Sequence, residues 1–173
     1  DLAYLGRTLH EEGPLRLGLA PNAFRLNDAG GRRIPYTHYP ALVPLTLSAV
    51  YGIAPPELEP LAFRTVGLLA AVLFLGALYL LGRELGGPLL GAWALFFGAV
   101  NGLQFFYGAF PGMFQFSNLF AAAAYAGYLS WRRTGRGSGL LASALGFFGL
   151  FHSAWWYYPA VLPVAADLFF FRP

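Results

Sequence analysis

The chain has 173 residues, of which 57% are hydrophobic and 18% aromatic, while only 11% are charged. Ordinary soluble domains carry about 25% charged residues, so this composition indicates a membrane protein or a piece of one. All eleven basic residues are arginine, the net charge is only +3, and the sequence contains no cysteine. These features exclude a nucleic-acid-binding surface and a disulfide framework.

The first 39 residues form the most polar part of the sequence, with nine of the nineteen formal charges. Leu2, Leu5 and Leu9 recur at helical spacing, Asp1 stands in the N-cap position, and Gly13 stands in the C-cap position. The pattern predicts a short amphipathic helix within a polar loop region. Because the chain opens at Asp1 without a signal-peptide pattern, we expect it to be an excerpt from a longer chain.

A first apolar run covers residues 40–54, contains Pro44 and ends at a proline pair. A membrane-spanning helix needs about 20 residues, so we expect an interfacial or re-entrant helix here. The arginine distribution leaves the alternative open, because the five arginines before this run would join the cytoplasmic set if residues 40–54 crossed the bilayer.

Longer apolar runs then follow one another, separated by short connections. They occupy residues 61–82, 88–107, 112–131, 138–153 and 155–171. The pattern predicts an all-α fold, a multi-pass transmembrane helical bundle of about five helices over residues 61–173. Residues 1–60 are expected to form an extracytoplasmic loop with two short juxtamembrane helices.

The arginines after residue 61 predict the orientation of this bundle. Arginine is enriched in cytoplasmic loops. In this arrangement one side of the membrane collects Arg83, Arg132, Arg133, Arg136 and Arg172, while the connections on the other side contain no arginine. We therefore expect a multi-pass protein of the plasma (inner) membrane, with residues 1–39 and the aromatic turns near residues 107–116 and 152–158 outside the cytoplasm.

The sequence lacks the common motifs of soluble enzymes: a P-loop, a dinucleotide-binding glycine fingerprint, paired histidines at i and i+4, and a nucleophile elbow. Any chemistry must use polar groups at the membrane face. Asp1 is either an N-cap or a general base toward a hydroxyl acceptor, and the two roles are compatible because a cap fixes the carboxylate. Asn101 and Gln104 are expected to bond between helices, and Asp167 is expected to reach the nearby cytoplasmic surface.

His38 lies in the segment IPYTHYPAL, between two prolines that stiffen the backbone and beside Tyr36 and Tyr39. A histidine held by such a stiff backbone is suited to bind a phosphate or a metal. The alternative is that the His38 ring only anchors the segment at the level of the lipid head groups. Arg32 and Arg33 are more simply solvated charges than ligands of a lipid-linked phosphate.

His152, in the run HSAWWYYP, is either part of an aromatic belt or close to the same cavity as His38. Together with Asp1 the two histidines would offer ligands to a divalent metal. The sequence leaves metal dependence open, and no other cofactor is expected.

Three quoted segments carry a resemblance over roughly residues 1–136. They are DLAYLGRTLHEEG, in which an acid opens an amphipathic helix, the H-x-P-x-L segment HYPALVPLTLSAVYGI, and the arginine-bearing span LAFRTVGLLAAVLFLGALYLLGRELGG. Their order resembles the polyprenyl-phosphate-sugar-dependent glycosyltransferases of the GT-C superfamily, the group of protein O-mannosyltransferases and lipid A aminoarabinose transferases.

The resemblance implies transfer of a sugar from a polyprenyl-phosphate carrier to a hydroxyl of protein, lipid or glycan outside the cytoplasm. It implies Asp1 as the acid that activates the acceptor and places His38 in the loop segment that approaches the donor phosphate. Tyr36, Tyr39, Arg33 and His152 complete the expected substrate-binding residues.

Two departures from the family pattern leave room for a divergent enzyme. Asp1 is followed by Leu2 where many members have glutamate, and the segment AFPGMFQFSN lacks an acid that many members place there. The alternatives are a non-catalytic transporter or assembly subunit, and a lipid-carrier binding module. A transporter should carry polar residues near the bilayer midplane, and these runs have almost none.

Overall fold

The computed structural model describes residues 2–13, 41–101, 112–153 and 159–170. Every secondary-structure element assigned within these ranges is a helix, which confirms the all-α class. The elements are α1 (Leu2–Glu12), α2 (Leu42–Ile53), the 3-10 helix η2 (Pro56–Leu58), α3 (Glu59–Val100), α5 (Met113–Thr134), α6 (Gly137–Ser153) and α7 (Leu162–Phe170).

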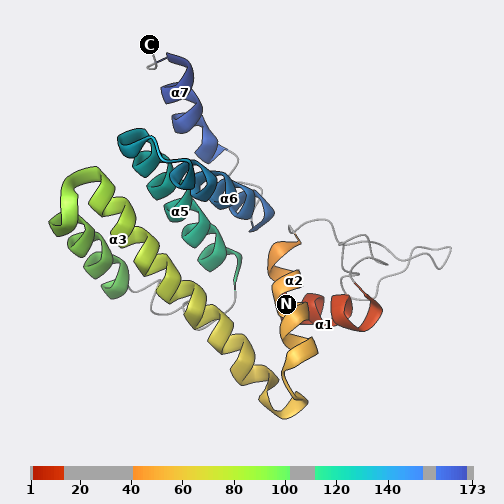
Figure 1. Ribbon diagram of the computed structural model, residues 1–173. Coiled ribbons are helices and arrows are strands. Elements are labelled where there is room, and N and C mark those ends of the chain that lie inside the picture. Colours follow the sequence, from red (N-terminus) through yellow and green to blue (C-terminus); the bar gives the residue numbers. More distant parts are fainter. Residues whose placement is uncertain (1, 14–40, 102–111, 154–158, 171–173) are drawn as a thin grey trace.

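Helix α1 ends where its sequence predicts. Gly13 adopts φ 84°, a left-handed conformation that glycine tolerates, and its N–H donates to the Leu9 carbonyl at 3.0 Å. Leu5 and Leu9 are both buried, and α1 lies against α2 (Figure 1). The predicted amphipathic helix is therefore confirmed.

Helix α2 is short and lies across the end of the bundle. Its 12 residues rise over about 18 Å, well below the ~30 Å of a hydrocarbon core. Val43 and Leu47 are fully buried and pack with Ala70 of α3 and Phe116 of α5. A helix over this stretch is confirmed, while its interfacial position stays a prediction.

Helix α3 turns back on itself at two glycines. Gly86 (φ −156°, ψ 24°) and Gly87 (φ 85°, ψ −179°) leave the helical region, and the angles of Gly87 suit glycine almost exclusively. Beyond them the chain runs back along the first half of α3 (Figure 1). A Cβ on Gly91 would lie only 2.7 Å from the Tyr79 carbonyl oxygen. The break falls at the connection predicted between the runs 61–82 and 88–107.

Among the described helices, α3 alone is long and apolar enough to cross a membrane by length and composition. Helix α2 and residues 159–170 are shorter apolar helices. The last predicted run, 155–171, is described as helical only from residue 159, and its α-helix begins at Leu162. The expectation of about five spans is therefore not established by helix length.

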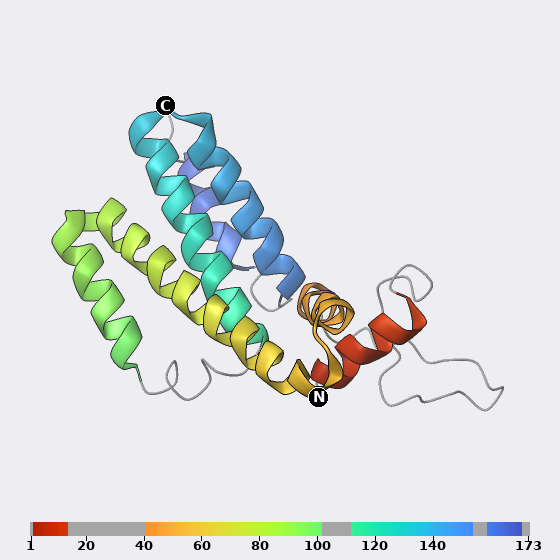
Figure 2. The ribbon, with the colours of Figure 1, turned by 60° about the horizontal axis from the view of Figure 1, so that its bottom comes forward.

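Helices α5 and α6 are antiparallel neighbours, joined by a tight turn, and α7 packs beside them (Figure 2). Their bounds agree closely with the predicted runs 112–131 and 138–153. Gly135 ends α5 with φ 69°, and its N–H donates to the Trp131 carbonyl at 2.7 Å. The shared core of the three helices contains Ala124, Tyr128, Phe147, Leu150 and Val164.

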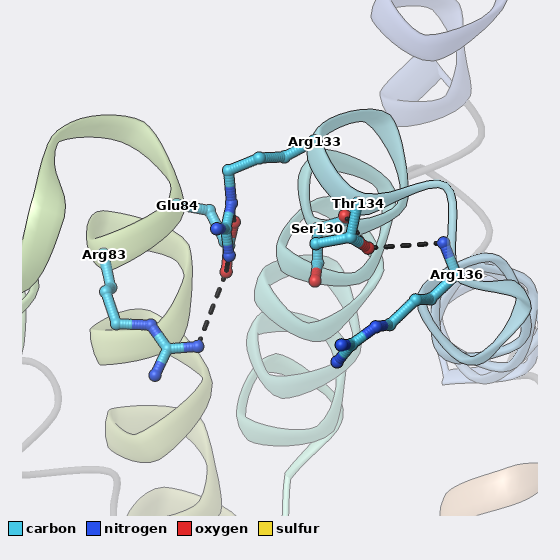
Figure 3. A network of polar contacts seen from close by, with 6 residues as sticks. All are labelled: Arg83, Glu84, Ser130, Arg133, Thr134 and Arg136. Atoms are coloured by element: carbon cyan, nitrogen blue, oxygen red, sulfur yellow. Dashed lines mark hydrogen bonds and ion pairs between the residues drawn. The ribbon is translucent and has the colours of Figure 1, made fainter.

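The bundle has two different ends. We call one the α1–α2 end, where α1 and α2 meet the starts of α3 and α5. We call the other the arginine end, which contains Arg83, Arg132, Arg133 and Arg136 around the α3 turn and the α5–α6 turn (Figure 3). Arg83 and Arg133 both contact Glu84 there, so these two predicted same-side arginines do lie together. Arg172 lies outside the described residues.

Candidate functional site

Most residues of the predicted site lie outside the described part of the chain. They are Asp1, Arg33, Tyr36, His38 and Tyr39. Their roles as base and as donor-binding groups stay predictions. The described residues next to them in the sequence belong to α1 and α2.

His152 is the one predicted site residue that the structure describes. It is exposed at the second-to-last position of α6, with its ring 4.3 Å from the Phe148 ring. The next residue, Ser153, is buried and reaches Ser117 at the start of α5, with 3.0 Å between the hydroxyl oxygens. His152 thus lies where α6 ends beside the start of α5, and both of its predicted roles remain compatible with this place.

The start of α5 buries polar groups. Ser153 donates its hydroxyl to the Leu150 carbonyl at 2.9 Å, so in the contact with Ser117 the proton comes from Ser117. Gln115 is only 3% exposed, and among the described residues its Oε1 has no hydrogen-bond partner. A buried acceptor of this kind is costly unless a donor satisfies it. This position suits the hydroxyl of a ligand or a water molecule.

A second group of polar side chains joins α1, α2 and the start of α3. We call it the Arg7 cluster: Arg7, His10, Glu11, Tyr51 and Glu59. The Arg7 guanidinium lies 3.4 Å from Glu59 Oε2, 3.8 Å from Glu11 Oε1 and 5.5 Å from the centre of the Tyr51 ring. The His10 and Tyr51 rings stack with their centres 6.2 Å apart.

The electrostatics of the Arg7 cluster do not favour a phosphate. One guanidinium faces two carboxylates, which leaves a net negative charge. Partial burial raises the pKa of the Tyr51 phenol, against the opposing effect of Arg7, so at neutral pH its O–H stays a hydrogen-bond donor. The Arg7–Glu11 pair is about half exposed on both sides and contributes little to stability.

An apolar cavity of about 340 Å³ opens between the end of α2 and the start of α3. Its size is within the range of small-molecule sites. It is lined by Val50, Ile53, Ala54, Pro55, Leu58, Leu61, Ala62 and Thr65. Val50 directly precedes Tyr51, and Leu58 directly precedes Glu59. The cavity and the Arg7 cluster therefore share the connection between α2 and α3, which gives this end an apolar and a polar side.

No metal site is formed by the described ranges, because no three His, Asp or Glu residues within them lie close enough to hold an ion. The metal site considered from the sequence combines His152 with Asp1 and His38, which lie outside those ranges. It stays a hypothesis.

Comparisons of the chain with protein-family models, with curated proteins and with solved structures found no match. The resemblance to GT-C glycosyltransferases therefore rests on the sequence features alone.

Several polar pairs escaped the sequence reasoning. Asp167 was expected only to reach the membrane surface, yet it accepts a hydrogen bond from Tyr128 and lies 3.1 Å from Arg132 Nε. Glu84 binds Arg133 through two hydrogen bonds of 2.8 and 3.0 Å (Figure 3). The partners in each pair are 35 to 49 residues apart, so no local spacing could reveal them.

Proposed function

We propose that this chain is part of an integral-membrane GT-C-type glycosyltransferase. It transfers a sugar from a polyprenyl-phosphate carrier to a hydroxyl acceptor on the extracytoplasmic side. The observation that carries the proposal is the apolar cavity at the α1–α2 end, which suits the apolar chain of a lipid-linked sugar. The Arg7 cluster beside it does not favour a phosphate, so the proposal assigns the phosphate of the carrier to Arg33 and His38.

The proposed topology makes the protein multi-pass. The predicted runs 61–82, 88–107, 112–131, 138–153 and 155–171 cross the membrane, while α2 lies at the interface because its run, residues 40–54, is too short to cross. Large apolar side chains of α3 and α6 are exposed and would face lipid, among them Leu73, Leu89, Phe97 and Phe148. The arginine end lies in the cytoplasm, and the α1–α2 end outside it.

In the proposed reaction, the oxygen of the acceptor hydroxyl attacks the anomeric carbon of the donor sugar. Asp1 takes the hydroxyl proton as the new carbon–oxygen bond forms. The bond between the anomeric carbon and the carrier phosphate breaks, and its electron pair leaves with the phosphate. Arg33 and His38 stabilise the negative charge of the departing phosphate, while Tyr36 and Tyr39 bind the donor.

A lipid-carrier binding module without catalysis is the second candidate. The apolar cavity favours it, because such a cavity serves binding whether or not a base is present. Moreover, two described carboxylates near the cavity, Glu11 and Glu59, both form ion pairs with Arg7. Carboxylates engaged in this way are poorly placed to act as a catalytic base, which is consistent with a module that only binds.

The test replaces Asp1 in the intact protein. Asp1→Asn removes the base while keeping the side-chain size, and we expect transfer from a polyprenyl-phosphate sugar to fall by about 10² to 10⁴. Glu57→Gln is the matched control, since Glu57 is an exposed acid at the same end. Membrane levels of both variants are compared by immunoblotting.

Three outcomes separate the candidates. Loss of transfer in Asp1→Asn alone, at an unchanged membrane level, supports the glycosyltransferase. Unchanged transfer in Asp1→Asn removes Asp1 as the base. Binding of the carrier by the wild-type protein without any transfer favours the binding module.

A further inference from the structure

The arginine end carries more positive than negative charge. Arg83, Arg133 and Arg136 lie around the two turns, with Glu84 as the acid of the α3 turn (Figure 3). Arg132, in the last turn of α5, pairs with Asp167 of α7. Four guanidinium groups against two carboxylates leave a local charge of about +2. A basic patch at the end of a helical bundle attracts anions.

The Glu84 carboxylate, at the α3 turn, is covered by arginines. The Glu84 side chain is only 3% exposed, and both of its oxygens accept hydrogen bonds from Arg133. Arg83 contributes a longer contact of 3.5 Å to Glu84 Oε1. The Arg133 and Arg83 side chains are themselves 62% and 45% exposed. Their remaining N–H groups therefore face outward, whereas the negative charge lies beneath them.

Arg136 adds a guanidinium that no other described residue neutralises. Its backbone N–H donates to Thr134 Oγ1 at 3.3 Å, while its side chain forms no hydrogen bond or ion pair with a described residue. It stands in the turn directly after α5, three residues beyond Arg133 in the sequence (Figure 3). Its donors are available to an anionic ligand.

A cavity of about 520 Å³ opens at the α3 turn, between Arg83 and Arg133. The other lining residues are Glu84, Leu85, Gly86, Gly87 and Pro88. A Cβ on Gly87 would meet no atom within 4 Å, so the turn backbone is open on that side. The cavity thus offers guanidinium groups together with an uncrowded backbone.

The surface next to this cavity is apolar. Leu85, Leu89 and Trp93 are exposed on either side of the α3 turn, with Leu89 71% exposed. Trp93 also stacks on Phe97, with ring centres 5.7 Å apart. A free phosphate gains nothing from such a surface, whereas the acyl chains of a phospholipid would lie along it while the head group meets the arginines.

We infer that the α3-turn cavity binds the phosphate of an anionic phospholipid head group, with Arg83 and Arg133 as its ligands and Arg136 as a further positive charge at the same end. Basic pockets between helix ends at the cytoplasmic face bind such head groups. The inference needs the protein to reside in a membrane, but it does not depend on glycosyl transfer.

The test uses the intact protein reconstituted in phosphatidylcholine bilayers. Electron spin resonance compares the association of spin-labelled phosphatidylglycerol with that of spin-labelled phosphatidylcholine. We expect the wild-type protein to prefer the anionic lipid severalfold. Each arginine removed from the cavity should lower this preference by up to about fivefold, and Arg83→Gln/Arg133→Gln should bring it close to equality.

Two further variants keep the test decisive. Arg83→Gln alone removes only the 3.5 Å contact to Glu84 Oε1 among the described side-chain contacts, so it serves if the double variant folds poorly. Arg64→Gln is the matched control, because Arg64 is an exposed arginine in the first turns of α3, toward the opposite end. A preference that survives in the double variant, or that falls as much in Arg64→Gln, overturns the inference.

Inorganic phosphate distinguishes the two sources of the anion. At constant ionic strength, millimolar inorganic phosphate should leave the lipid preference of the wild-type protein unchanged. If phosphate abolishes the preference and also binds the detergent-solubilised protein without lipid, the ligand is free phosphate and the lipid proposal is wrong.

Discussion

The packing of α5 against α6 makes a sharp prediction about Gly146. This glycine is buried in α6, and a Cβ added to it would lie 2.6 Å from the Ala124 backbone nitrogen and 2.7 Å from the Ala124 Cα. Carbon atoms in contact are normally about 3.5–4.0 Å apart. Because the neighbour is backbone, it cannot rotate away, and the two helices must separate to admit a methyl group.

The cost follows from this geometry. Overpacking in a tight core costs about 1–3 kcal/mol. Gly→Ala in a helix returns up to about 1 kcal/mol through helix propensity. Gly146→Ala should therefore lower the free energy of unfolding by about 1–2 kcal/mol. Gly76→Ala is the matched control, since a Cβ on Gly76 of α3 meets nothing within 4 Å, and it should leave stability unchanged or raise it slightly.

Thermal unfolding of the purified protein in detergent, followed by circular dichroism, measures the difference. At about 2–4 °C per kcal/mol for a chain of this size, Gly146→Ala should melt several degrees below Gly76→Ala. If the two variants melt together, α5 and α6 do not approach as closely as described, and the packing argument fails.

Two other predictions concern the arginine end and the topology. In a double-mutant cycle, Glu84→Gln/Arg133→Gln should destabilise the protein less than the sum of the two single substitutions. The reason is that Arg133→Gln alone leaves the Glu84 carboxylate without its two hydrogen bonds. Additive losses of unfolding free energy would show that the pair is not coupled. Since the sequence has no cysteine, Thr37→Cys and Thr134→Cys each introduce a single thiol. An impermeant thiol reagent applied to intact cells should label the first and not the second, and labelling of position 134 alone would reverse the proposed topology.

The helices were predictable because apolar runs and their breakers are local features of the sequence. Gly13 ends α1, Gly135 ends α5, and both adopt the positive φ that glycine permits. Gly86 and Gly87 followed by Pro88 mark the turn of α3 in the same way. In each case one or two residues without a normal side chain or a normal N–H decide where a helix stops.

Helix α7 shows the limit of such local reasoning. The run 155–171 is apolar apart from Asp167, and its apolarity does not specify where the helix starts. The α-helix begins at Leu162, immediately before Pro163. Proline is favoured in the first turn of a helix and disfavoured in its interior, so Pro163 favours a start close to this point.

The polar contacts between helices were not predictable, because they depend on helix register. Tyr128 meets Asp167, and Ser117 meets Ser153, across 39 and 36 residues of sequence. Local spacing identifies partners only within one helix, at three or four residues. The sequence offers each of these side chains several partners of the right chemistry, and only the packing of α5 with α6 and α7 selects one.

The α3 turn bears most strongly on the proposed topology. An uninterrupted helix of 42 residues would extend about 63 Å, twice the thickness of a hydrocarbon core. The break at Gly86 and Gly87 divides it, and residues 59–85 alone cover about 40 Å, enough for one tilted crossing. A chain that turns back at this point returns toward the side from which it came. Two such crossings would keep the start of α3, with the Arg7 cluster and the apolar cavity, on one face, and Arg83 and Glu84 on the other. In this topology, the proposed sugar transfer and the inferred anionic-lipid binding would take place on opposite faces of the membrane, so variants at one face should leave the other activity intact.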